Sequence, residues 1–219
     1  MLILGIDEAG RGSVIGPLVI AGLMIKEKDT DKLRELRVRD SKELSPERRE
    51  NLFPKIKRVA KDYVVLKVSA QEIDELRAQK INLNKIEALR MAQIIKTLNA
   101  HKAYVDAPQV STEKFKKILL DLAKNHTEII SENYADKKYP VVSAASIIAK
   151  VERDKEVEKI KKITKFDCGV GYSHDARAIR FVKKFMKHKE FSKYIRHSWV
   201  TVSDIKEKKE QKKLNEYKF

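Results

Sequence analysis

The sequence is poor in cysteine and has no long apolar run. Cys168 is the only cysteine, which excludes an intrachain disulfide and a cysteine-based zinc site. The longest apolar stretches, such as VIGPLVIAGLMI, contain Gly and Pro and are too short for a bilayer span, which needs about 20 residues. Asp7 and Glu8 interrupt the only N-terminal apolar run, which argues against a signal peptide. We therefore expect a soluble, cytoplasmic protein.

Acidic residues are few relative to basic ones. The chain has 48 Lys and Arg against 32 Asp and Glu, and its net charge is +16 at pH 7. Such an excess indicates a polyanionic partner, with nucleic acid as the first choice and an anionic membrane surface as the second. A basic surface of the ribosomal or heat-adapted kind would give the same composition, so charge alone does not decide between them.

The 219 residues suffice for one core with a small appendage. Apolar patterning predicts strands over residues 2–6, 17–26, 62–70, 103–106 and 127–132. Helix-start signals and helical periodicity predict helices over residues 45–61 (with Pro54 as a potential break), from 69, and over 84–98, 111–124, 143–163 and 175–189, then a basic helical tail from 198. This order predicts a mixed sheet with helices on its faces.

Acidic residues fall near the ends of the predicted strands. Asp7 and Glu8 end the first strand, Asp106 ends the fourth, and Asp136 follows the fifth. If these strands are neighbours, their carboxylates share one crevice, where mutual repulsion makes them costly unless a hard divalent cation is bound. For any one of these acids, capping a helix or pairing with a lysine is the simpler explanation. Their joint placement favours a metal site.

The loop AGRGSVIG directly follows Asp7 and Glu8. Gly10 and Gly12 permit positive φ angles and a close approach of the main chain to a ligand. The loop amides and Arg11 can donate hydrogen bonds to phosphate or sugar oxygens. Taken alone, the motif is equally typical of a hairpin turn.

Five motifs together resemble a known family. GIDEAGRG, DSKELS, YVDAP, ADKKYPVVSAASIIAKVERD and GVGYSHD occur in the order and spacing of the type 2 ribonucleases H, and the chain resembles archaeal ribonuclease HII from Leu2 to about Val202. The resemblance implies an α/β, ribonuclease H-like fold with a five-stranded mixed sheet flanked by helices. It places the catalytic core in residues 1–165 and a helical C-terminal region with a basic tail in 166–219.

The resemblance also implies an activity. Members cut the RNA strand of RNA/DNA hybrids and incise at ribonucleotides embedded in duplex DNA. Two-metal-ion catalysis leaves 5′-phosphate and 3′-hydroxyl products, and the reaction removes misincorporated ribonucleotides and RNA primers. The expected cofactors are two Mg²⁺ or Mn²⁺ ions, and the expected ligands and catalytic residues are Asp7, Glu8, Asp106 and Asp136.

Substrate contacts carry over motif by motif. Gly10, Arg11 and Gly12 would read the 2′-hydroxyl of a ribonucleotide, and Tyr172 would stack at the RNA-to-DNA step. The residues that match the family's contacts to backbone phosphates are Ser41, Lys42, Ser143, Ser146 and Lys150. We also expect the helix that starts near Ser143 to present free amides to a phosphate.

Three departures from the family pattern affect these assignments. Ser13 stands where the family usually has proline, which should loosen the glycine loop. Asn133 and Tyr134 replace a His-Lys pair before the fourth acid, which should weaken contacts to the substrate backbone. GYSHD replaces GYPSD, so the backbone around Tyr172 is expected to be less fixed.

Two alternatives remain open at this point. A type 3 ribonuclease H shares several motifs but carries an extra N-terminal substrate-binding domain, for which the position of Asp7 leaves no room. A basic nucleic-acid-binding protein without catalysis would gain nothing from four acids against phosphates. We expect a monomer that binds RNA/DNA hybrid and ribonucleotide-containing duplex DNA and no membrane. The tail QKKLNEYKF faintly resembles a peptide that binds the sliding clamp.

Overall fold

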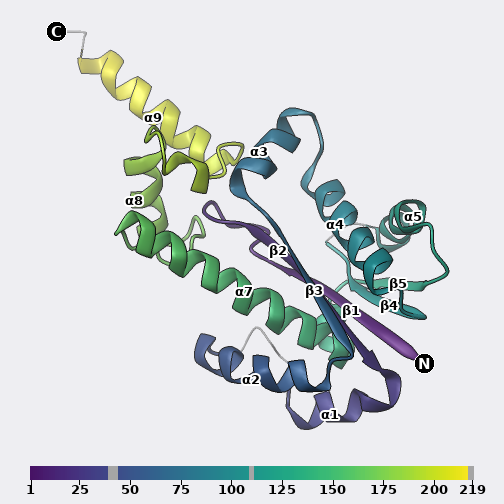
Figure 1. Cartoon of the computed structure of the whole chain (residues 1–219). Helices are drawn as coiled ribbons and strands as arrows, with labels where there is room; N and C mark the ends of the chain where they lie inside the picture. The colour runs from purple at the N-terminus through teal and green to yellow at the C-terminus, as the bar shows by residue number, and fades with distance from the viewer. Residues whose placement is uncertain (39–43, 109–110, 217–219) are drawn as a thin grey trace. The chain divides into compact units, whose positions relative to one another are not determined.

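The computed structural model describes residues 1–38, 44–108 and 111–216, with side chains described through 208 and at 211 in the last helix. The strands are β1 (Leu2–Ala9), β2 (Leu18–Lys26), β3 (Asp62–Val68), β4 (Lys102–Asp106) and β5 (Glu128–Glu132). The α-helices are α1 (Thr30–Glu35), α2 (Pro46–Val59), α3 (Ala70–Ala78), α4 (Leu83–Leu98), α5 (Thr112–Ala123), α6 (Ala135–Lys138), α7 (Pro140–Thr164), α8 (Ala176–Phe185) and α9 (Val200–Glu216) (Figure 1). Short 3₁₀ turns are η1 (Glu27–Asp29) and η2 (Ser192–Tyr194).

The described residues form two compact units. The first consists of Met1–Arg11, Val19–Lys67 and Asn82–Asp154, and the second of Gly12–Leu18, Val68–Ile81 and Lys155–Phe219. The first unit contains almost all of the sheet, and the second contains α3, the C-terminal part of α7, α8 and α9. Within the described part of the chain, no helix combines the length and apolar character needed to cross a membrane.

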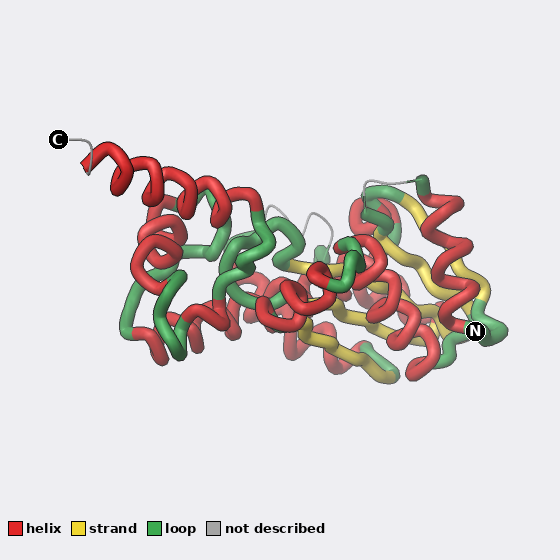
Figure 2. The backbone as a smooth tube through the Cα atoms, turned by 90° about the horizontal axis from the view of Figure 1, so that it is seen from above, coloured by secondary structure: helices red, strands yellow, loops and turns green. Residues whose placement is uncertain are grey.

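The sheet has five strands in the order β3-β2-β1-β4-β5, which confirms the predicted mixed sheet. β1 is antiparallel to β2 and parallel to β4, and β4 is parallel to β5. In Figure 2 the strands run as one yellow layer with red helices beside them. The parallel register pairs Ile6 of β1 with Val105 of β4, so Asp7 and Asp106 both come directly after this pair.

One face of β1 lies directly against the start of α7. A Cβ atom added at Gly5 would lie 2.4 Å from the backbone carbon and oxygen of Val141, so only glycine permits this approach. Side chains alternate between the two faces of a strand, so Ile3, Gly5, Asp7 and Ala9 share this face. Ile3 and Ala9 accordingly belong to one buried cluster with apolar residues of α7. Asp7 therefore faces the same helix.

The opposite face of the β1–β2 pair packs against α4. A Cβ atom at Gly22 of β2 would lie 2.2 Å from Cγ2 of Ile94 and 3.4 Å from Cδ1 of Leu98. Gly22 is paired with Ile6, and by the same alternation Glu8 lies on the face of Ile6. The two adjacent acids of β1 thus belong to different faces of the sheet.

Two helices, α7 and α4, begin earlier than predicted. α7 begins at Pro140 instead of near Ser143, because proline fits the first helical turn and the Ser143 amide already donates to the Tyr139 carbonyl at 3.0 Å. The prediction of free amides at Ser143 is therefore wrong. α4 begins at Leu83, because Asn82 is its N-cap and accepts a hydrogen bond from the Lys85 amide at 2.9 Å.

α2 continues through Pro54 and does not break there. A proline inside a helix costs one backbone hydrogen bond. Leu52 and Ile56, on either side of Pro54, are both buried and anchor the helix through this point. Ser45 caps α2 and Ser69 caps α3, as predicted from the sequence.

The second unit has its own apolar core. This core includes buried aromatic and branched side chains of α7, α8 and the segment before β2, namely Val14, Ile15, Val157, Ile160, Phe181, Val182 and Phe185. Ser13 is fully buried beside this core and forms an isolated antiparallel bridge with Tyr172. Ser13 therefore lies in a paired segment.

We predict that Gly5→Ala destabilises the protein by about 1–3 kcal/mol, because the new methyl group meets backbone atoms of α7 that cannot move independently of the helix. Gly12→Ala is the matched control, since the heavy atom nearest to its new methyl group, Cε1 of Tyr172, lies 4.0 Å away. Urea unfolding of both variants measures the difference. Equal midpoints for the two variants would contradict the close approach of α7 to β1.

Candidate active site

The two adjacent acids lie inside β1 and not beyond its end. β1 runs to Ala9, and Asp7 and Glu8 are paired in register with Ala21 and Ile20 of β2. β1 thus extends beyond the strand predicted over residues 2–6, because its ladder with β2 continues to Ala9. This pairing holds the backbone of both acids in a fixed orientation.

Three of the four predicted acids lie close together near the C-terminal ends of β1 and β4. Carboxylate oxygens of Asp7, Asp106 and Asp136 all lie within 4.8 Å of one another. Asp7 and Asp136 are 5% and 4% exposed, respectively, so the cluster is largely withdrawn from water. This arrangement concentrates negative charge, and such a cluster is suited to a divalent cation.

Hydrogen bonds from neighbouring residues hold the cluster in place. The Ala135 amide donates to Asp106 at 2.8 Å, and the Ser143 hydroxyl donates to the Asp136 carbonyl. The Asn133 side-chain amide donates to the carbonyls of Ala107 and Pro108, both at 3.2 Å. Asn133 thus ties the end of β5 to the end of β4, next to Asp106.

Burial and repulsion act strongly on Asp7. Loss of water, followed by the charge of Asp106, raises the pKa of Asp7 from 3.8 to about 7. A hydrogen bond from Ser146, another from the Glu8 amide and the charge of Lys150 oppose this rise. Two predicted phosphate contacts, Ser146 and Lys150, therefore lie beside Asp7.

Glu8 has different neighbours from Asp7. Burial raises its pKa, and the next largest cause is Glu87, followed by Asp7 and Asp106. Its Oε2 atom is buried and has no hydrogen-bond partner within the part of the chain that the structure describes. Glu8 thus lies between the three-acid cluster and Glu87 of α4, and its role as a metal ligand stays a prediction.

Sequence reasoning missed Glu87 and Asn84. Glu87 is fully buried and forms an ion pair with Arg11, and the Arg11 guanidinium also donates to the Asn84 side chain at 2.6 Å. α4 therefore holds the arginine of the glycine loop. Both residues stood in NKIE, which resembled a helix-start box. The only available signal was a charged residue on the apolar face of the helix.

The two glycines of the loop differ in conformation. Gly10 has φ = 83° and uses the freedom that glycine permits, whereas the φ of Gly12 lies outside the left-handed region. The nearest atom to a Cβ built at Gly12 is Cε1 of Tyr172, at 4.0 Å. Gly12 lies in the turn at residues 11–12 and keeps space free beside the Tyr172 ring.

Of the remaining predicted phosphate contacts, the structure describes Ser143. Ser143 is buried and lines a pocket together with Arg34, Arg37, Lys137 and Lys138. Four cationic side chains around one pocket suit a phosphate group. Ser41 and Lys42 lie outside the described residues.

Similar proteins share both this fold and the sequence motifs. The crystal structure of the ribonuclease H2 from Pyrococcus horikoshii OT3 superposes with a TM-score of 0.87 at 39% identity, covering 95% of this chain and 98% of that one. The chain of a PCNA:RNase HII complex from Archaeoglobus fulgidus gives a TM-score of 0.83 at 42% identity, covering 93% and 96%. The fold and the acidic edge of the sheet thus define a ribonuclease H-like enzyme.

The family follows from the sequence comparison. The family model for ribonuclease HII matches residues 4–202. Ribonuclease HII of Pyrococcus furiosus is 42% identical over 97% of this chain and 95% of its own length. The chain belongs to the ribonuclease HII family, which confirms the predicted resemblance, and it is a metal-dependent endonuclease of the ribonuclease H class that acts on RNA/DNA hybrids.

The raised pKa of Asp7 predicts how stability depends on pH. The folded protein binds more protons than the unfolded chain between pH 3.8 and about 7, so the metal-free protein loses stability as pH rises through this window. Mg²⁺ or Mn²⁺ needs the ionised carboxylates and should raise Tm more at pH 8 than at pH 5. Thermal unfolding with and without metal at both pH values tests this.

Asp7→Asn should raise Tm of the metal-free protein at pH 8 and reduce the gain on adding metal. Asp121→Asn, which changes an exposed residue of α5, serves as the control and should behave like the parent protein. A metal-induced gain that is as large at pH 5 as at pH 8 would contradict the assigned pKa direction.

Proposed function

We propose that this enzyme incises duplex DNA at embedded ribonucleotides, in addition to cutting the RNA strand of hybrids, and leaves 5′-phosphate and 3′-hydroxyl ends. The observation that supports this most is the group of Asp7, Asp106 and Asp136, whose oxygens lie within 4.8 Å of one another at the edge of the sheet. In this proposal the reaction removes misincorporated ribonucleotides and RNA primers.

The donor set suits divalent cations. We propose that Asp7, Glu8, Asp106 and Asp136 hold two Mg²⁺ or Mn²⁺ ions, since hard cations prefer carboxylate oxygens. The buried Oε2 of Glu8 and the raised pKa of Asp7 both indicate carboxylates whose burial and mutual repulsion are not fully offset by the charges of Arg11 and Lys150. When bound, such ions supply Lewis acidity at the scissile phosphate and activate water.

Residues around these acids would orient the substrate. Gly10 has a left-handed backbone, which permits a close approach of the loop to a sugar, and Glu87 and Asn84 hold Arg11 beside it. We assign Gly10, Arg11 and Gly12 to recognition of the 2′-hydroxyl, the group that distinguishes RNA from DNA. Tyr172 would stack at the RNA-to-DNA step. Lys150 beside Asp7, and the pocket lined by Arg34, Arg37, Lys137 and Lys138, would attract backbone phosphates.

A catalytically inactive nucleic-acid-binding protein on the same fold fits these observations less well. Burying mutually repelling carboxylates costs free energy in the absence of metal, and their negative charge would repel a phosphate backbone. A pure binding protein would gain nothing from that cost.

We predict a metal-dependent nick beside a single ribonucleotide in an otherwise DNA duplex, and cleavage along the RNA strand of a hybrid. Asp7→Asn should reduce cleavage by more than about 100-fold while hybrid affinity changes little, because the variant removes a metal ligand and leaves the basic surface intact. Product ends are read on a sequencing gel, with chelator as the negative control and Asp121→Asn as the matched variant. If the hybrid is cut and the embedded ribonucleotide is not, the proposed incision is wrong.

We also propose that the C-terminal tail binds a sliding clamp. The A. fulgidus relative was solved as a PCNA complex, and QKKLNEYKF at residues 211–219 faintly resembles a clamp-binding peptide. Except at residue 211, the side chains of this peptide lie outside the described part of the chain. The proposal therefore rests on the sequence and on that relative.

Replacing both Tyr217 and Phe219 by Ala should weaken binding to an archaeal PCNA by about tenfold or more, since aromatic anchors dominate such interfaces. Cleavage of short duplexes should not change. Lys213→Ala controls for loss of charge. Unchanged PCNA affinity of the double variant in surface plasmon resonance would exclude the tail as the contact.

A further inference from the structure

The loop that carries Tyr172 joins the end of α7 to the start of α8 in the second unit. Its sequence from Asp167 to Asp175 is DCGVGYSHD. Gly169 and Gly171 both have positive φ, 59° and 78°, so the chain reverses sharply just before Tyr172. Glycines lose more conformational freedom on folding than other residues, so such a loop needs additional contacts to keep one conformation.

Two carboxylates fix the backbone near the ends of this loop. Asp167 accepts a hydrogen bond from the Gly169 amide at 2.8 Å. Asp175 accepts one from the Val170 amide at 3.1 Å and, as N-cap of α8, another from the Arg177 amide at 2.9 Å. Each carboxylate therefore orders one part of the turn that precedes Tyr172.

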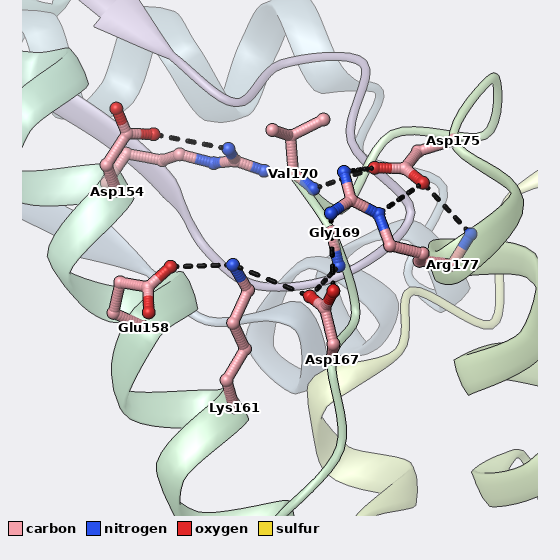
Figure 3. Close-up of polar contacts among 9 residues, drawn as sticks. Asp154, Glu158, Lys161, Asp167, Gly169, Val170, Asp175 and Arg177 are labelled. Carbon is pink, nitrogen blue, oxygen red and sulfur yellow. Dashed lines mark hydrogen bonds and ion pairs between the residues drawn. The ribbon is translucent and has the colours of Figure 1, made fainter.

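Arg177 joins the two carboxylates. Its guanidinium donates to both oxygens of Asp175, at 2.8 and 3.1 Å, and to Oδ2 of Asp167 at 3.2 Å (Figure 3). The first of these contacts is the main reason that the pKa of Asp175 lies well below its usual value. A planar guanidinium can bind one carboxylate with two donors and reach a second carboxylate with a third, a geometry that the compact ammonium group of lysine does not reproduce. The single side chain of Arg177 thus bridges both ends of the loop.

The backbone packs tightly against this bridge. A Cβ atom at Gly169 would lie 1.9 Å from Oδ2 of Asp175 and 2.9 Å from Nε of Arg177. The order set by these groups continues to Gly171, whose carbonyl accepts hydrogen bonds from the amides of Val14 and Ile15, at 2.9 and 3.1 Å. Tyr172, the next residue, forms the isolated antiparallel β-bridge with Ser13.

We propose that Arg177 is a positioning residue that fixes the Asp167–Asp175 loop and thereby holds Tyr172 in the orientation needed at the RNA-to-DNA step. The inference rests on the proposed role of Tyr172 in selecting embedded ribonucleotides. Arg177 acts through the loop and does not touch the reacting atoms. Its effect should therefore depend on Tyr172 and on the type of substrate.

The first experiment measures kcat and KM on a single embedded ribonucleotide and on a long RNA/DNA hybrid. Arg177→Ala should lower kcat/KM about tenfold on the embedded ribonucleotide and less than about threefold on the hybrid, equivalent to about 1.4 and 0.6 kcal/mol. Arg177→Lys should resemble Arg177→Ala, because lysine cannot keep the two-donor contact with Asp175 while it also reaches Asp167. Arg180→Ala removes the same charge from an exposed position of α8 and should match the parent enzyme.

A double variant separates positioning from a direct phosphate contact. Adding Arg177→Ala to Tyr172→Ala should change kcat/KM by less than about twofold, since the two residues act as one unit. Additive losses, equal losses on both substrates, or full activity of Arg177→Lys would each overturn the proposal.

Hydrogen exchange tests the loop independently of activity. Arg177→Ala should speed exchange of the Val14 and Ile15 amides about tenfold, because their acceptor on Gly171 becomes less ordered. Unchanged exchange of these amides would overturn the proposed ordering of the loop by Arg177, even if activity falls. If the parent enzyme cuts hybrids but not embedded ribonucleotides, the proposed function and the task of Tyr172 fail together, while the exchange result still decides whether Arg177 orders the loop.

Discussion

The active site depends on the close approach of the α7 backbone to β1 at Gly5. Because no side chain separates Gly5 from Val141, the first turn of α7 lies directly on the strand that carries Asp7. This contact brings Ser146 and Lys150 to the Asp7 carboxylate. It also places α6, which carries Asp136, near Asp106, and three carboxylates meet there.

The alternation of side chains along β1 gives its two acids different surroundings. Asp7 faces α7 and belongs to the three-acid cluster, whereas the pKa of Glu8 is raised first by burial and next by Glu87 of α4. Glu87 also holds Arg11, which lies two residues after the end of the strand. One strand and its two flanking helices thus couple the electrostatics of the acidic cluster to the position of the glycine-arginine loop. A change on either face of the sheet will affect both.

Polar contacts position the functional loops, while apolar contacts hold the elements that carry them. Arg11 is bound by Glu87 and Asn84, and Arg177 joins Asp167 to Asp175. Backbones such as those at Gly10, Gly169 and Gly171 have left-handed conformations, which neighbouring hydrogen bonds keep in place. Arginine suits both sites because its planar group can donate to two acceptors at once.

The sequence by itself determined the strands in their order along the chain and the caps at Ser45, Ser69 and Asp175, and it named the three acids that meet in the structure, because these depend on local patterns and on family motifs. It did not reveal Glu87 as the partner of Arg11 or the pairing of Ser13 with Tyr172. Such contacts join residues far apart in the chain, and only the tertiary structure decided them. Local propensity is the same whether Glu87 faces water or Arg11, and burial against β1 makes the difference.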